Sequence, residues 1–381
     1  YGLKQAGRIW YTTMCKGLLE IGFKQSVSDT CLFHMIEENS TILITTWVDD
    51  CIVSFDNAER WKTILARICK KFTLGAGVDF EWCLGMAVHR DKESGDICLH
   101  QSLYVQNLLK RFKMEDAAVV RTPADPSVTL NKEMSPQSDA ERALAAKVPY
   151  RELLGALLHL ANFTRPDIAI AVNLCARYAS DPGEEHWNAL KRILRYLKGT
   201  IDPGTGNSPG LRYKGRDTGP LVEGYVDADH ARCPDTRKST LGYMFFSGTG
   251  PISWEATKQK IIAQSTAEAE YIALAEATKE AIWLRKILRD LQLAVPTVKI
   301  WEDNQACIKL AENPVHHKRT KHIDVRYHFV LDHLKKEHID VQYVKTDDQL
   351  ADILTKPLPK PRFESLADRI LSWPEPRPWH S

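Results

Sequence analysis

The sequence contains no run of about 18 apolar residues, so it predicts no membrane-spanning helix. It does not open on a basic segment followed by an apolar one, so nothing in it indicates secretion. Charge of neither sign dominates, because 51 Lys and Arg stand against 49 Asp and Glu. Any attraction to nucleic acid must therefore come from local clusters of charge. These absences lead us to expect an intracellular protein with no membrane partner.

Cysteine pairs at metal-binding spacing are also absent. The nine cysteines are scattered from Cys15 to Cys307, and none forms a CxxC pair. This excludes a zinc knuckle or a disulfide framework and favours reduced, buried thiols. The chain of 381 residues is too long for one typical domain, and with 44% hydrophobic and 26% charged residues its composition is that of a globular protein.

The pattern of apolar residues predicts an α/β protein built from three parts and a tail. Residues 1–115 mix strands and helices, and two β-rich runs there are joined by an acidic turn at Asp49 and Asp50. Residues 116–210 read as a proline-containing linker followed by helices with basic outer faces. Residues 215–358 read as a separate α/β domain. The proline-rich residues 359–381 predict a flexible tail.

Residues 215–358 predict a mixed sheet covered by helices. The expected order is three strands, a long helix, a strand, two helices, a strand and a last helix. The strands are expected at residues 221–226, 241–246, 251–254, 298–301 and 339–344, and the long helix at residues 266–291.

Four acidic residues of this domain lie where these elements begin or end. Asp227 closes the first strand, Glu270 lies in the first turns of the long helix, and Asp303 ends the fourth strand. Asp352 lies in the last helix. Carboxylates at strand ends can converge on one crevice, where they need cations to coexist. Oxygen ligands suit Mg²⁺ or Mn²⁺, and two such ions about 3.5–4 Å apart can promote phosphodiester hydrolysis.

Neighbouring acids offer alternatives to this set. Ser265 and Glu268 form the pattern of a helix-capping box, which leaves Glu270 free for a metal. Asp229 lies on the same strand face as Asp227 and competes with it, whereas strand alternation predicts that Glu302 points away from Asp303. Each acid taken alone can be a solvated or capping residue. The coincidence of four acids at these places favours a metal site.

The densest basic run is HHKRTKH at residues 316–322. It is interpreted as a phosphate contact of Lys318, Arg319, Lys321 and His322 beside the acidic site. A solvated basic loop is the alternative. A metal site built from the histidines is a third possibility, although the spacing does not place two imidazoles on one helix face.

Several motifs together resemble a known family. They are WVDD (47–50), TRPDIA (164–169), AEAEYIAL (267–274), EDNQ (302–305) and RTKHIDVRYH (319–328). From residue 1 to residue 358 the sequence resembles the reverse transcriptase–ribonuclease H region of copia-type retrotransposon polyproteins.

The resemblance implies a set of functional residues and a reaction. The nuclease family's four metal-binding acids fall on Asp227, Glu270, Asp303 and Asp352. The resemblance therefore favours Asp227 over Asp229 as the metal ligand of the first strand. The implied activity is cleavage of the RNA strand of an RNA–DNA hybrid with two Mg²⁺ or Mn²⁺ ions, leaving a 3′-hydroxyl and a 5′-phosphate. The implied partners are the hybrid and the rest of a polyprotein, in a cytoplasmic particle or the nucleus. The sequence departs from the family pattern at two places. His230 stands where the family usually has Trp, and the short segment 344–349 lacks the His that related cellular enzymes carry there.

The polymerase part of the resemblance is incomplete. Asp49 and Asp50 resemble the Tyr-x-Asp-Asp motif, but the family's other catalytic Asp lies upstream of the point where this sequence starts. We therefore expect that this chain cannot polymerise nucleotides by itself. The alternatives are a reverse transcriptase that is active only within a longer chain, and an inactive relic that at most binds nucleic acid.

Overall fold

The computed structural model describes residues 4–75, 77, 79–215, 219–312 and 321–374, with only the backbone for residues 321–324. The chain divides into two compact units. The smaller comprises Tyr1–Phe80 and Ile282–Pro296, and the larger comprises Glu81–Ala281 and Thr297–Ser381. This division differs from the expected one at residues 115 and 210–215. Among the described helices, none is both long and apolar enough to span a membrane.

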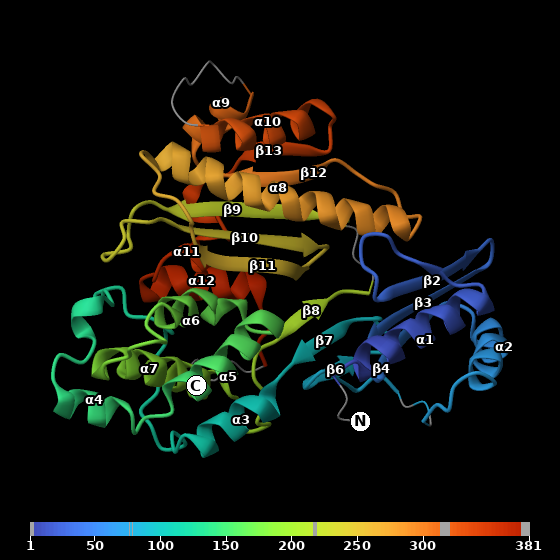
Figure 1. The fold of residues 1–381 in the computed structure, drawn as a ribbon, viewed down its shortest axis with the longest axis horizontal. Coiled ribbons are helices and arrows are strands. Elements are labelled where there is room, and N and C mark those ends of the chain that lie inside the picture. Colours follow the sequence, from blue (N-terminus) through green and yellow to red (C-terminus); the bar gives the residue numbers. More distant parts are fainter. Residues whose placement is uncertain (1–3, 76, 78, 216–218, 313–320, 375–381) are drawn as a thin grey trace. The chain divides into compact units, whose positions relative to one another are not determined.

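The smaller unit is an antiparallel sheet with two helices (Figure 1). The strands β1 (Lys24–Gln25), β2 (Leu32–Glu37), β3 (Ser40–Trp47) and β4 (Asp50–Phe55) follow in that order, with α1 (Ala6–Ile21) and α2 (Ala58–Cys69). Alternation along β3 buries Ile42 and Ile44. Trp47 pairs with Asp50, so the two β-rich runs and their acidic turn are confirmed.

The larger unit begins with a small sheet and a group of helices. The sheet has the order β5 (Trp82–Cys83), β6 (Met86–Arg90), β7 (Ile97–His100) and β8 (Leu211–Tyr213). Between β7 and β8 the chain forms α3 (Ser102–Arg111), α4 (Asp139–Ala145), α5 (Tyr150–Phe163), α6 (Ala169–Ala176) and α7 (Glu184–Thr200), with 3₁₀ turns at Lys132–Met134 and Pro166–Ile168.

The second sheet of the larger unit has the five-stranded order β11-β10-β9-β12-β13. The strand β9 (Glu223–Asp229) pairs antiparallel with β10 (Thr240–Ser247), which pairs antiparallel with β11 (Gly250–Lys258). On its other side β9 pairs parallel with β12 (Val298–Glu302), which pairs parallel with β13 (Ile339–Tyr343). The associated helices are α8 (Thr266–Asp290), α9 (Gln305–Glu312), α10 (Lys321–Lys335) and α11 (Asp352–Thr355). The predicted α/β class and element order are confirmed.

The helices α5 to α7 share one core with this sheet. Leu157 of α5 and Leu194 of α7 belong to the same buried cluster as Met244 of β10 and Leu354 of α11. The two segments that we expected as separate parts, residues 116–210 and 215–358, are therefore joined by a common core in the larger unit.

The prediction of a flexible tail is wrong for residues 360–370. These residues form α12 (Lys360–Ile370), which follows Pro359 and buries one face in the same core. Its buried residues are Phe363, Leu366, Ala367 and Ile370. Their helical spacing provides enough apolar surface to order the segment, and Pro361 fits the first turn of a helix. Residues 375–381 lie outside the described residues.

A fully buried ion pair connects the turn before α6 to α7. The guanidinium of Arg165 binds both carboxylate oxygens of Asp167, from Nε to Oδ1 at 2.9 Å and from Nη2 to Oδ2 at 2.7 Å. The hydroxyl of Tyr196 donates to Asp167 Oδ2 at 2.6 Å, and Arg165 Nη1 donates to Thr200 Oγ1 at 3.0 Å. Arg165 and Asp167 are 1% and 0% exposed, so every charge here is paired without water.

Gly242 allows α11 to lie directly on β10. A Cβ atom at this position would be 2.7 Å from Leu354 Cβ and 2.8 Å from Thr355 Cγ2. Gly242 is also the strand partner of Asp227. The absence of a side chain at residue 242 thus sets how closely α11, with Asp352 and Thr355, approaches Asp227.

We expect Gly242→Ala to lower the free energy of unfolding by about 1–3 kcal/mol, because the added methyl must push α11 away from the sheet. Urea denaturation followed by circular dichroism measures the change. Gly155→Ala is the matched control, since Gly155 is exposed on α5 with nothing within 4 Å of the added atom. An unchanged stability for Gly242→Ala would contradict the close approach.

Candidate metal centre

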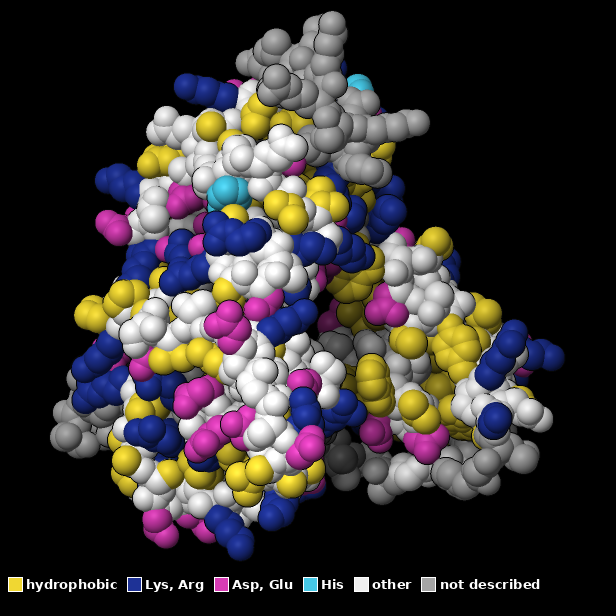
Figure 2. All heavy atoms as spheres, turned by 60° about the vertical axis from the view of Figure 1, so that its left-hand side comes forward, with side chains coloured by type: hydrophobic (Ala, Val, Ile, Leu, Met, Phe, Trp, Pro, Cys, Tyr) yellow, Lys and Arg dark blue, Asp and Glu magenta, His cyan; other side chains and the backbone are white. Residues whose placement is uncertain are grey.

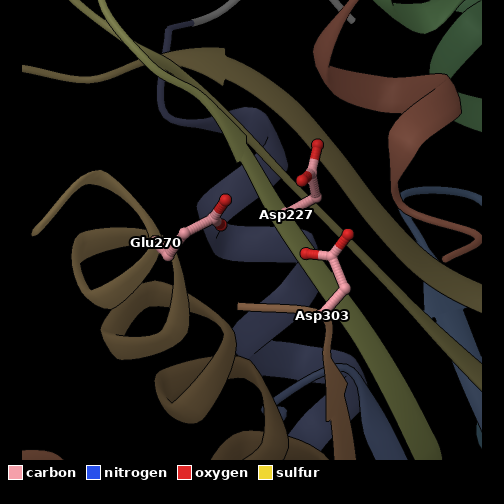
Figure 3. A group of neighbouring side chains, drawn as sticks. All are labelled: Asp227, Glu270 and Asp303. Carbon is pink, nitrogen blue, oxygen red and sulfur yellow. The ribbon is translucent and has the colours of Figure 1, made fainter. Parts of the chain in front are cut away.

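Three of the four predicted acids meet in an open pocket of the larger unit. Asp227, Glu270 and Asp303 each offer a carboxylate oxygen, and these oxygens lie within 4.8 Å of one another. Figure 3 shows the three side chains converging from β9, α8 and the end of β12. The pocket has a volume of about 640 Å³ and is lined by Asp227, Ala228, Asp229, His230, Thr266, Glu270, Asp303, Asn304, Gln305 and Lys356.

The register of two parallel strands brings Asp227 and Asp303 together. Tyr225 of β9 pairs with Trp301 of β12, and each acid follows its partner by two residues. Since parallel strands end at the same edge of the sheet, both carboxylates reach the same crevice. The convergence expected for these two acids is what the structure shows.

The start of α8 positions Glu270. Ser265 Oγ accepts a hydrogen bond from the backbone N–H of Glu268 at 3.2 Å, and the Glu268 carboxylate accepts one from Gln264 N at 2.9 Å. Glu268 therefore has the capping role predicted for it, although its carboxylate bonds Gln264 rather than Ser265. The buried face of the helix carries small residues such as Ala269 and Ala273, which let α8 approach the sheet.

Burial controls the charge of the acidic cluster. Asp227 is 3% exposed, and burial raises the pKa of its carboxyl to about 7 against the opposing effect of Lys356. Glu270 is 4% exposed, and burial followed by the charge of Glu302 raises its pKa well above the usual value. Within the described residues, Glu270 Oε2 has no hydrogen-bond partner. A buried carboxylate oxygen without a partner, beside two other carboxylates, fits a divalent cation.

Glu302 is a fifth acid beside the cluster. It is 0% exposed, Oε1 accepts from Asn304 N at 2.9 Å, and burial raises its pKa well above the usual value. It is not one of the three acids whose oxygens converge. Strand alternation predicted its direction relative to Asp303, but it could not show that Glu302 lies close enough to Glu270 to raise the pKa of that residue.

The fourth predicted acid, Asp352, is held by two cationic side chains. Lys356 Nζ lies 2.7 Å from Asp352 Oδ1, and Arg362 Nη2 lies 3.2 Å from Oδ2. Lys356 Nζ also lies 3.8 Å from Asp227 Oδ2, which in addition accepts a hydrogen bond from the Thr355 hydroxyl. Burial opposes a charged Lys356, but Asp227 and Asp352 outweigh it and raise the pKa of this ammonium. Asp352 thus faces cations rather than joining the group of three.

The side chains that hold Asp352 and Asp227 were not expected from the sequence. Lys356 stands four residues after Asp352, a spacing that places both on one helix face and that was visible in the sequence. Arg362 lies in the segment that we interpreted as a tail. Gln349 was also missed, although it is fully buried and its Nε2 donates to Val226 O at 2.9 Å, next to Asp227.

The remaining predicted site residues lie elsewhere. Asp49 and Asp50 are exposed on the β3–β4 hairpin of the smaller unit. Lys318 and Arg319 lie outside the described residues, and the side chains of Lys321 and His322 are not described either. Their contact with phosphate stays a prediction.

The described charges do not gather into one basic face in the view of Figure 2, where Lys and Arg side chains are interspersed with Asp and Glu. His230, whose role the sequence left open, lines the pocket, and its Nε2 lies 3.2 Å from Ala263 O.

The raised pKa of Asp227 predicts a dependence of stability on pH. The folded state binds the proton of this carboxyl more tightly than the unfolded state, so its stabilising effect is complete below the ordinary value of 3.8 and is lost as the pH rises through about 7. In EDTA, Asp227→Asn should therefore gain stability relative to the native chain between pH 5 and pH 7. Urea denaturation of both proteins measures this difference. Both proteins contain the same histidines, so the titration of these residues does not contribute to the difference. A difference that does not change with pH would contradict the buried carboxyl.

The chain is similar to known proteins over most of its length. Residues 1–126 match the family model described as reverse transcriptase (RNA-dependent DNA polymerase). The chain is 39% identical over 365 residues to the retrovirus-related Pol polyprotein from transposon TNT 1-94 of Nicotiana tabacum, covering 96% of this chain and 27% of the relative. It is 38% identical over 374 residues to that from transposon RE2 of Arabidopsis thaliana, covering 97% of this chain and 24% of the relative.

Among solved structures, LC11-RNase H1 isolated from compost by a metagenomic approach matches with 16% identity and a TM-score of 0.28, covering 35% of this chain and 91% of that one. The chain spans about a quarter of the length of the two transposon polyproteins that it matches. The identity along nearly the whole chain shows the family. The chain belongs to the copia-type retrotransposon Pol polyproteins, and it corresponds to a region that carries a reverse transcriptase domain.

Proposed function

We propose that the larger unit hydrolyses the RNA strand of RNA–DNA hybrids with the help of Mg²⁺ or Mn²⁺. The observation that carries this proposal is the convergence of Asp227, Glu270 and Asp303 from three separate elements, with their oxygens within 4.8 Å of one another. The unpartnered Oε2 of Glu270 supports a cation at this place. Membership of the Pol polyprotein family supports nucleic acid as the substrate.

We propose a role for each of the four acids. A divalent ion at this place would supply Lewis-acid activation of the phosphate and of a water molecule. Asp227, near the carboxyl end of β9, and Asp303, directly after β12, would hold the ion relative to the sheet. Glu270 would approach it from α8 and orient the attacking water. Asp352 would complete a second metal position in the two-ion mechanism that the family resemblance implies.

Membership of the same family supports an RNA–DNA hybrid as the substrate. Copying an RNA template into DNA creates an RNA–DNA hybrid, and a ribonuclease in the same polyprotein removes the template. We propose Lys318, Arg319, Lys321 and His322 as phosphate contacts that hold this duplex, and the remainder of a Pol polyprotein as the natural partner, in a cytoplasmic particle or the nucleus.

Strand-specific cleavage tests this function. A hybrid that carries different labels on its two strands is incubated with the purified chain and Mg²⁺, then with EDTA. We expect cuts in the RNA strand only, with 3′-hydroxyl and 5′-phosphate ends, and none in EDTA. Duplex DNA and duplex RNA of the same sequence are the controls, and cleavage of the DNA strand would contradict the proposal.

The smaller unit carries a second candidate function. Asp49 and Asp50 are exposed on a hairpin within the residues that match the reverse transcriptase model, which favours metal binding for nucleotidyl transfer within a polyprotein. We propose this role for the whole polyprotein and not for this chain by itself. Because these two acids lie on the smaller unit, Asp49→Asn serves as a further control in the cleavage assay and should leave the rate unchanged.

A further inference from the structure

We propose that the ammonium group of Lys356 acts as the second cation of the acidic site, so that the protein without nucleic acid binds one divalent ion and not two. This inference rests on the metal site of the proposed function and deepens it. It concerns the position between Asp227 and Asp352, where a second ion of the implied mechanism would otherwise lie.

Lys356 lies between two of the acids that would hold a second ion. Its Nζ is 2.7 Å from Asp352 Oδ1 and 3.8 Å from Asp227 Oδ2, so it bridges two of the four acids. The side chain is only 28% exposed and lines the same pocket as the three converging carboxylates. Thr355, the residue before it, donates its hydroxyl to the same Asp227 oxygen. A second ion would have to displace both contacts from Asp227 Oδ2.

Arg362 reinforces this effect from the other side of Asp352. Its Nη2 lies 3.2 Å from Asp352 Oδ2, so both oxygens of this carboxylate face a cationic group of the chain itself. Lys356 and Arg362 thus place two positive charges against Asp352. A second divalent ion beside Lys356 Nζ would be repelled by both of them, which is unfavourable in a mostly buried site.

Another possible role of Lys356 is purely structural, as an ion pair that fixes α11. The two roles differ in what happens when the charge is removed and the length of the side chain is kept. Lys356→Met retains the apolar stem that lines the pocket and frees Asp352 Oδ1, while Asp227 Oδ2 keeps only its hydrogen bond from the Thr355 hydroxyl. A structural role predicts a change in stability only. The role as a cation predicts that a second divalent ion now binds.

The test is the stoichiometry of Mn²⁺ binding to the purified chain without nucleic acid, measured by titration calorimetry and by the loss of the free Mn²⁺ paramagnetic resonance signal. We expect one ion for the native chain and for Lys356→Arg, and two for Lys356→Met. Lys279→Met is the matched control, because Lys279 pairs with Glu276 on α8 and does not line the pocket. It should bind one ion.

A native stoichiometry of two, or of one in both the native chain and a folded Lys356→Met, would overturn the inference. If Lys356→Met does not fold, the native stoichiometry decides by itself. The failure of this inference can be distinguished from the failure of the proposed function. A chain that binds one ion and cleaves no hybrid would overturn only the nuclease activity, whereas two ions with active cleavage would overturn only the role of Lys356.

Discussion

Replacing Glu270 by Gln should lower the rate of hybrid cleavage by roughly 10³-fold or more, which corresponds to about 4 kcal/mol of lost transition-state stabilisation. The amide keeps the shape of the side chain but removes the charge that attracts the ion. Within the described residues, Glu270 Oε2 has no hydrogen-bond partner, so the proposed ion would be its partner. Single-turnover cleavage of a labelled hybrid at saturating Mg²⁺ measures the loss.

The same substitution should make the metal-free protein more stable. The carboxyl of Glu270 is buried, and burial together with the charges of Glu302 and Asp227 disfavours its ionised form, so the uncharged amide is easier to bury. Urea denaturation in EDTA at pH 8 should therefore show Glu270→Gln as more resistant than the native chain.

Glu276→Gln is the matched control for Glu270→Gln. Glu276 lies on the same helix and pairs with Lys279, and its side chain is 31% exposed. This variant should cleave at the native rate. Full activity of Glu270→Gln would contradict the metal site, and a loss of activity caused by unfolding would be revealed by the denaturation curve.

Asp167→Ala should have the largest effect on stability, a loss of about 3–5 kcal/mol in the free energy of unfolding. The substitution leaves the guanidinium of Arg165, which is 1% exposed, without its bidentate partner inside the core. It also removes the acceptor of the Tyr196 hydroxyl. Because this network connects the turn before α6 to α7, we expect the loss to affect the cooperative unfolding of the larger unit.

The exposed pair of Asp332 and Lys336 provides the comparison for Asp167→Ala. Their charged atoms lie 2.8 Å apart at the end of α10, and the side chain of Asp332 is 52% exposed. Asp332→Ala should leave the free energy of unfolding nearly unchanged, because water screens the pair. Guanidinium denaturation measures both variants. Similar values for the two would contradict the role assigned to the buried pair.

The part of the site that could be predicted from sequence is the part set by local pattern. The apolar alternation of β9 and β12 placed Asp227 and Asp303 at strand ends, and their parallel pairing brings strand ends to one edge. The spacing of Ser265 and Glu268 identified the start of α8 and separated a capping acid from Glu270. These inferences needed only neighbours along the chain and the general geometry of sheets and helices.

The parts that were missed depend on contacts between distant segments. The helical spacing of Phe363 and Leu366 was present in the sequence, but the surrounding prolines led to the interpretation as a tail, and only packing against the core shows that α12 is ordered. Because residues 360–370 were expected to be a flexible tail, the contact of Arg362 with Asp352 could not be predicted. In the same way, no local pattern in α5 to α7 shows that these helices share a core with β10.

The most direct measurement of the proposed chemistry compares the native chain with Asp303→Asn on a hybrid labelled in its RNA strand, in Mg²⁺ and at equal, verified fold content. Asp303 is the least buried of the three converging acids, so the amide should disturb the fold little. We predict cleavage of the RNA strand by the native chain and a loss of roughly 10³-fold or more in the variant. Equal cleavage by both proteins, or none by a folded native chain, would contradict a metal-dependent hybrid nuclease at this site.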